Sequence, residues 1–212
     1  MIKLPFVTAF LLSLLGGSLP SSLSLEDERP VNDIIFNVPQ ELANDTLLIP
    51  RYDFLDPEDG AVGARREFVV NVNKQAKKGN TTINEIALKS YPYPYKLISL
   101  SEVAWYRDNG YKYFMDMALM PKQMRQPEPK ALIPAFEKFS TANKMFRNRN
   151  SMWHFYFYIR DLSTDDAYMT SKLKGSFEVY RCMKSFLGRV SGDLGSPTGV
   201  AGKLNAVKNK IR

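Results

Sequence analysis

The sequence predicts an α+β fold in which one long helix packs on an antiparallel sheet of four to five strands, followed by a flexible C-terminal tail. A helix-start signal near residue 56 precedes a stretch whose apolar residues recur at helical spacing. Further along the chain, several segments are rich in aromatic and β-branched residues and are separated by turn residues. A helix followed by a run of strands is typical of α+β domains.

The predicted helix runs from residue 57 to about residue 78. Asp56 supplies a capping side chain, and Pro57 is a first helical residue that needs no hydrogen-bond donor. Four apolar residues share one face, which we expect to lie across the inner side of the sheet: Phe68, Val69, Val72 and Ala76. Gly79 is expected to end the helix.

A β-hairpin is predicted next, with arms at residues 95–107 and 111–120. Its turn is Asp108-Asn109-Gly110, whose residues tolerate positive φ. Short extended pieces are also expected earlier in the chain, at residues 34–36 and 47–49.

Residues 152–161 give the clearest strand signal. Four apolar residues alternate there with polar ones and form a face expected to meet the helix: Trp153, Phe155, Phe157 and Ile159. After a turn at residues 162–166, strands at 167–174 and 176–183 are expected to complete the sheet.

The beginning of the chain is typical of a secretory precursor. After a short basic start, an apolar run at residues 4–15 is followed by small residues, so residues 1–24 are predicted to be a signal peptide and the protein to be secreted. The run is too short for a spanning helix, which needs about 20 apolar residues. The rest divides into an N-terminal extension (25–56), the predicted domain (57–183) and a basic, Gly-rich tail (184–212).

The chain is basic, with a formal net charge of +7. Residues 121–150 and residues 184–212 each carry a net charge of +5. Such segments are usually solvated surface, and otherwise they bind anionic glycans, lipid surfaces or nucleic acid. A secreted address argues against nucleic acid, so an anionic surface bound through the tail is the partner class that stays open.

The composition gives little support to an enzyme. The chain has one histidine, His154, and one cysteine, Cys182, so no internal disulfide and no His/Cys metal cluster is expected. We expect no cofactor, because no Gly-rich phosphate loop is present. Cys182 is either a buried thiol or a link to another chain, and a Cys182–His154 catalytic pair is a third alternative.

Two sequons predict N-glycosylation of a secreted chain. They are Asn44-Asp45-Thr46 and Asn80-Thr81-Thr82. We therefore expect sugar on Asn44 and Asn80.

Aromatic residues flank the predicted hairpin turn and make it the candidate partner-binding site. Exposed aromatics beside a rigid turn are the residues that anchor protein interfaces. The candidate contact residues are consecutive in the sequence: Trp105, Tyr106, Arg107, Asp108, Asn109 and Gly110.

Three parts of the chain resemble the cystatin family. Residues 63–74, with their basic pair and Asn-Lys, resemble the cystatin helix. Gly110-x-x-Tyr113-Phe114-x-Asp116 resembles the strand that leaves the first inhibitory hairpin, and residues 169–172 are similar to the closing strand. The resemblance spans residues 57–183. It implies a helix wrapped by an antiparallel sheet, with edge loops that wedge into papain-like cysteine proteases.

The inhibitory loops of that family are altered here. Residues 106–110 stand at the Gln-x-Val-x-Gly turn and keep only Gly110, and residues 161–166 lack the Pro-Trp of the second hairpin. Two functions follow. The first is a cystatin-like binder of a cysteine protease or related protein. The second is a non-inhibitory carrier or cathelicidin-like precursor whose basic tail binds anionic membranes or glycans.

Overall fold

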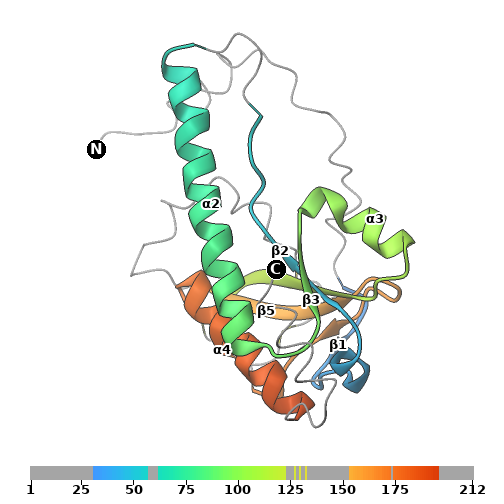
Figure 1. Ribbon diagram of the computed structural model, residues 1–212. Coiled ribbons are helices and arrows are strands. Elements are labelled where there is room, and N and C mark those ends of the chain that lie inside the picture. Colours follow the sequence, from blue (N-terminus) through green and yellow to red (C-terminus); the bar gives the residue numbers. More distant parts are fainter. Residues whose placement is uncertain are drawn as a thin grey trace.

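The computed structural model describes residues 31–56, 62–122, 153–172 and 174–195, together with Pro127, Pro129 and Leu132. The predicted signal peptide lies outside the described residues. Within them the fold is α+β, as predicted, with three α-helices and a six-stranded sheet of order β1-β6-β5-β4-β2-β3 (Figure 1).

The strands are β1 (Ile34–Ile35), β2 (Leu47–Pro50), β3 (Tyr95–Ile98), β4 (Tyr113–Pro121), β5 (Trp153–Asp161) and β6 (Ala167–Tyr168). The pairs β4–β5 and β5–β6 are antiparallel, whereas β1–β6, β2–β3 and β2–β4 are parallel. The prediction of an all-antiparallel sheet is therefore wrong. The short extended pieces predicted near residues 34 and 47 are confirmed as β1 and β2, and β2 separates β3 from β4.

The predicted hairpin at residues 95–120 is also wrong, although its second arm is confirmed as β4. β3 ends at Ile98, and the chain then forms a 3-10 helix, η3 (Leu100–Glu102), that leads into α3 (Val103–Asp108). The cause is a capping box at Ser99 and Glu102, in which each side chain bonds the backbone of the other residue. This Ser-x-x-Glu signal is visible in the sequence and predicts a helix start rather than a strand.

The long helix α2 (Ala64–Ser90) begins later and ends later than predicted. Gly79 lies inside it, in contact with the Tyr52 ring. The second half of α2 packs on the sheet through Ala76, Ile83 and Ala87, but Phe68 is 59% exposed. The expectation that the Phe68 end lies across the sheet is wrong, because this half of α2 extends past the sheet (Figure 1).

A third helix, α4 (Val179–Leu194), replaces the strand predicted at residues 176–183. Its buried residues recur at helical spacing: Cys182, Met183, Phe186, Leu187 and Val190. The predicted tail boundary at residue 184 falls inside α4, so residues 184–194 belong to a packed helix rather than to a flexible tail.

Both faces of the sheet are covered. On one face α2 and α4 pack on β2, β4 and β5, and the predicted apolar face of β5 is confirmed there for Phe155, Phe157 and Ile159. A short 3-10 helix, η2 (Gln40–Ala43), adds Leu42 to this core. On the other face α3 packs through Tyr106. Tyr156 and Tyr158 are buried on this face as well, in a separate cluster with Val31, Met120 and Met169, although alternation predicted a polar face.

Candidate functional site

The candidate site is the surface of α3 and its C-cap, which we call the α3 surface. It consists of five exposed residues: Trp105, Arg107, Asp108, Asn109 and Gly110. Trp105 is 59% exposed, although an indole is among the most apolar side chains that a surface can carry. Phe68 on α2 is equally exposed, and Trp105 differs from it in lying on an element that is capped at both ends.

The N-terminal end of this element is fixed by polar contacts. The backbone N–H of Ser99 donates to Glu102 Oε2 at 2.6 Å, and the N–H of Ser101 donates to Ser99 Oγ at 3.2 Å. Arg51 pairs with Glu102 at 3.8 Å, so the chain that follows β2 is tied to η3. Glu102 thus serves both as a cap and as an ion-pair partner.

Tyr106 anchors α3 to the sheet. It is buried against Leu48, Ile98 and Phe114, and its ring packs edge-on against Tyr111 at 4.9 Å between centroids. Trp105 packs edge-on against the same ring, also at 4.9 Å. Edge-to-face pairs add directional stability to the burial itself. The Trp105 side chain is thus exposed but rests on a buried aromatic pair.

The C-terminal end of α3 is closed by Asn109 and Gly110. Asn109 Nδ2 donates to the Trp105 carbonyl at 2.8 Å, and the N–H of Gly110 donates to the Arg107 carbonyl at 3.0 Å. Gly110 has a φ of 82°, a left-handed conformation that favours glycine. These bonds satisfy helix carbonyls that would otherwise lack partners.

Charges of both signs surround the indole. Arg107 Nε lies 3.7 Å from Asp108 Oδ1, and both side chains are exposed. Lys96 Nζ lies 4.9 Å from the centroid of the Tyr106 ring, and contact with the Tyr106 hydroxyl raises the pKa of Lys96. The rim of the α3 surface therefore combines two cations with one carboxylate.

The structure thus brings five of the six predicted contact residues to one exposed end of α3. Tyr106 is the exception, because its side chain lies in the core and cannot reach a partner. It positions Trp105 instead. The sequence predicted that either Trp105 or Tyr106 would be exposed, because neighbouring residues of a strand face opposite sides. One of the two is indeed exposed, but on a helix instead of a strand.

The two sequon asparagines have different environments. Asn44 is exposed after η2, where a sugar has room. Asn80 lies inside α2, where its Oδ1 accepts from the N–H of Tyr52 at 2.7 Å and its Nδ2 donates to the Tyr52 carbonyl at 2.9 Å. A glycan is linked through Nδ2, so glycosylation of Asn80 would compete with the hydrogen bond from Nδ2 to the Tyr52 carbonyl.

Cys182 is buried, as one of the sequence alternatives proposed. Its thiol donates to the Phe155 carbonyl at 3.1 Å, and burial raises its pKa to about 11. The thiolate is the nucleophilic form, so a buried, protonated thiol favours a structural role. His154 packs against Phe177, with 6.5 Å between ring centroids.

A buried polar network on the α3 side of the sheet was not found from the sequence. Asp116 and Arg160 are 2% and 8% exposed, and the Tyr158 hydroxyl donates to Asp116 Oδ2 at 2.9 Å. Arg160 pairs with Asp165 at 2.8 Å and with Asp116 at 3.9 Å. Burial opposes the charge of Arg160, but these carboxylates outweigh it and its pKa is raised.

Burial and the nearby Asp116 also raise the pKa of Tyr158, which stays protonated as a donor. Asp165 has a φ of 59°, which turns the β5–β6 loop so that its carboxylate reaches Arg160. Every member of this network has a protein partner, so we assign the network to the fold. The sequence signal for this network is weak. Asp116 and Arg160 are single charged residues within strands that are mostly apolar and aromatic, and nothing local shows that the two pair.

Comparison with family models, with curated proteins and with solved structures finds no significant match to this chain. Functional assignment therefore rests on the geometry alone. The described ranges contain no group of three or more acidic, His or Cys side chains placed to hold a metal ion. Among the same residues, no helix combines the length and apolarity needed to cross a membrane.

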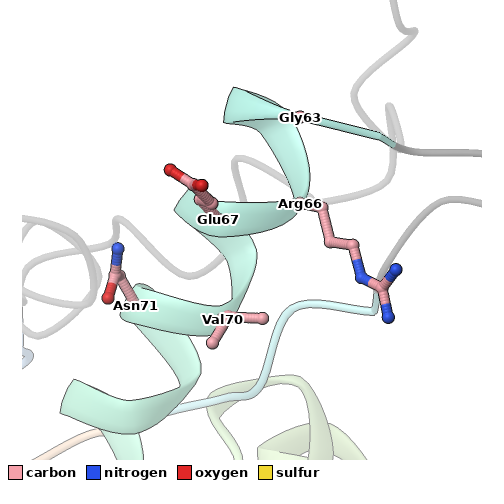
Figure 2. Close-up of a pocket in the computed structure, with 5 residues that line it drawn as sticks. All are labelled: Gly63, Arg66, Glu67, Val70 and Asn71. Atoms are coloured by element: carbon pink, nitrogen blue, oxygen red, sulfur yellow. The ribbon is translucent and has the colours of Figure 1, made fainter.

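A shallow hollow lies along the first turns of α2, on the half that extends past the sheet. It is lined by Gly63, Arg66, Glu67, Val70 and Asn71. Figure 2 shows Arg66 and Glu67 leaving the helix in different directions. All five residues are exposed, so the hollow is part of an open surface.

Proposed function

We propose that this chain is a secreted binding protein that contacts a partner protein through the α3 surface. The observation that carries the proposal is the 59% exposure of Trp105 on an element fixed at both ends by caps. Tryptophan is among the residues most enriched at interface hot spots, and Asp108 and Asn109, three and four residues after Trp105, lie on its side of the helix. A rigid element also loses little conformational entropy when it binds.

The chemistry of the rim favours a protein partner. Asp108 and Asn109 offer a carboxylate and an amide on the indole's side of α3, and Arg107 adds a cation that pairs with Asp108. A polyanion could use only the cations of this rim, whereas a protein surface can meet both signs of charge and also cover the indole. The partner we propose therefore presents an apolar pocket for the indole and mixed polar groups around it.

The resemblance to cystatins adds one named candidate, a papain-like cysteine protease. The inhibitory turn that the resemblance implies falls on residues 106–110, which form the end of α3 and its cap instead of an extended turn. An inhibitor of this kind would present the end of a short helix to the protease cleft. Binding to a papain-like protease is therefore tested in a separate experiment.

The alternative of a carrier with a releasable tail is not favoured. Release after residue 183 would remove Phe186, Leu187 and Val190 from the helix-side core. Losing several buried apolar side chains costs a domain much of its stability. A tail that acts separately would have to start beyond α4.

The experiment compares the mature chain with Trp105→Ala and with Phe177→Ala, a control that removes another exposed aromatic residue. Partners captured from conditioned medium by the wild type are identified, purified and titrated by surface plasmon resonance. We expect Trp105→Ala to weaken the identified complex at least ten-fold, a cost of about 1.4 kcal/mol or more. Equal affinity of the three proteins for every purified partner would refute the α3 surface.

A panel of papain-like proteases, assayed with the same three proteins, tests the named candidate separately. Inhibition that depends on Trp105 supports it. Absence of inhibition across the panel removes the protease but leaves the binding proposal to be judged on the titrations.

A further inference from the structure

A row of cations follows one side of α2, from its first turn to the point where Ala76 joins the core. Arg66, Lys74, Lys77 and Lys78 are all exposed. At 3.6 residues per turn they lie within about 120° of arc and span about 18 Å along the helix axis. We call these four residues the α2 cationic stripe.

None of the four makes an ion pair with a described residue. The ion pairs of α2 include Glu85–Lys89, at 3.7 Å, nearer the sheet. Glu67 is the one carboxylate on α2 before Ala76; it follows Arg66 within the same arc and offsets charge at that end, but it stands seven residues before Lys74, about 10 Å along the axis. Lys74, Lys77 and Lys78 are thus positive charge that no described carboxylate pairs with.

The spacing of these cations is unfavourable for the helix itself. Lys74 and Lys78 are four residues apart, and Lys74 and Lys77 are three apart, which are the two separations at which like charges face each other and destabilise a helix. The turns of α2 before Ala76 also lack the sheet beneath them, and short unsupported helices are marginal in water. A bound anion would remove the repulsion and stabilise the helix.

We propose that the α2 cationic stripe binds a linear sulfated glycan of the heparan sulfate class. A row of cations on one face matches a linear polyanion, whose charges recur along one direction. The secreted address expected from residues 1–24 places the protein where such glycans occur. The site is separate from the α3 surface, and it is distinct from the tail, since it uses none of residues 184–212.

A lipid membrane fits the stripe less well. Helices that lie in a membrane surface need a broad apolar face between their cations. Val70 is the only apolar residue within the stripe, and Phe68, two residues away, lies about 160° around the helix from it. The stripe would therefore meet a membrane with charge but without an inserting face.

The test uses the mature chain and two triple variants with the same change in net charge. The α2 variant is Lys74→Gln, Lys77→Gln, Lys78→Gln. The control is Lys112→Gln, Lys172→Gln, Lys174→Gln, which removes three exposed lysines elsewhere. Circular dichroism and thermal melting establish that each variant is folded before binding is measured.

A heparin octasaccharide is titrated at an ionic strength of about 0.15 M, where charges farther apart than about 8 Å are largely screened. Cations held near an anionic surface each contribute about five-fold in affinity, so the α2 variant should bind about a hundred-fold more weakly than wild type. The affinity of the control variant should fall by less than about ten-fold. The fully desulfated octasaccharide should not bind.

Four results would overturn the proposal. One is no binding of the octasaccharide by the wild type, and another is an equal loss in both variants, which would mean that net charge alone is responsible. The third is binding to vesicles of phosphatidylcholine and phosphatidylserine but not to the octasaccharide, which would assign the stripe to lipid. An unchanged affinity in the α2 variant would likewise transfer any glycan binding to another segment.

Discussion

Replacement of Gly79 by alanine tests how closely α2 is held against Tyr52 of segment 51–56. A Cβ at this position would lie 2.5 Å and 2.6 Å from two carbons of the Tyr52 ring, and 3.0 Å from the Tyr180 hydroxyl. Carbon atoms cannot approach this closely, so the ring or the helix must move. Tyr52 is buried, and both of its backbone polar groups are bonded to Asn80, so it has little freedom to do so.

The sign of the effect follows from two opposing terms. Alanine is favoured over glycine inside a helix by about 1 kcal/mol, whereas overpacking a core site costs about 1–3 kcal/mol. Since the contact is severe, we expect Gly79→Ala to lower the free energy of unfolding by about 1–2 kcal/mol in total. For a domain of this size that corresponds to a fall of roughly 3–8 °C in Tm.

Gly188 provides a matched control. It also lies inside a helix, but a Cβ there would meet nothing within 4 Å. Gly188→Ala should therefore stabilise the protein by about 0.5–1 kcal/mol, because the helical preference acts alone. Urea denaturation followed by circular dichroism measures both variants on the same scale.

The double variant Tyr52→Ala, Gly79→Ala measures how much of the destabilisation comes from the Tyr52 ring. With the ring removed, Gly79→Ala should become neutral or stabilising relative to Tyr52→Ala alone. If Gly79→Ala is as stable as wild type or more so, the close contact between segment 51–56 and α2 does not constrain the helix, and the reasoning fails.

Three further predictions concern the other side of the sheet and the core. Gly175→Ala should destabilise the protein by about 1–3 kcal/mol, because its Cβ would meet the buried Tyr156 ring, and urea denaturation measures the loss. Asp116→Asn should cost about 3 kcal/mol, and adding Arg160→Met should cost less than the two single changes together, since a buried pair is worse half-removed than wholly removed. Iodoacetamide should alkylate Cys182 only after unfolding at pH 8, because burial raises its pKa to about 11; rapid alkylation of the folded chain would contradict its burial.

The Cys182 thiol also predicts a direction for stability against pH. Its folded pKa of about 11 lies above the ordinary value of 9.0, so the folded chain keeps the proton longer than the unfolded chain. The resulting stability is complete below pH 9 and is lost as the pH rises from about 9 to about 11.

The elements that the sequence predicted correctly are those with a strong local pattern. β4 and β5 were placed within two residues of their observed ends, because β4 begins shortly after the turn residue Gly110 and β5 alternates apolar with polar residues. The turn at residues 162–166 was also correct, and Asp165 holds the positive φ there. Local chemistry decides these features, so one sequence is enough to find them.

The errors have two different causes. The capping box at Ser99 and the helical spacing of Cys182, Phe186 and Val190 were present in the sequence, but aromatic content near Trp105 favoured strands over helix. The parallel pairing of β2 with β3 and β4 is different, because it joins segments more than forty residues apart. Nothing local determines that contact, so neither sheet order nor the exposure of Phe68 follows from the sequence.

The candidate site shows the same division. Exposure of Trp105 was predicted from alternation in a strand, and it is observed on a helix for another reason, the burial of the neighbouring Tyr106. The α2 cationic stripe was not predicted, because its importance depends on where α2 leaves the sheet. A basic helix that packs along its whole length would look the same in the sequence.

Segment 51–56 connects the two proposed surfaces. At one end Arg51 pairs with Glu102, the cap residue of η3, and further along Tyr52 and Leu55 are bonded to Asn80 and Asn73 of α2. Figure 1 shows this segment running between α2 and α3. Because the contacts of Tyr52 and Leu55 with α2 are hydrogen bonds of 2.7–2.9 Å, glycan binding that stabilises α2 would also stabilise the segment. The coupling ends at Arg51, whose exposed ion pair is worth about 0–1 kcal/mol, so the two surfaces should bind nearly independently. Two sites that act independently on one rigid fold suit a protein that is held at a glycan-rich surface by α2 while α3 remains free to engage its partner.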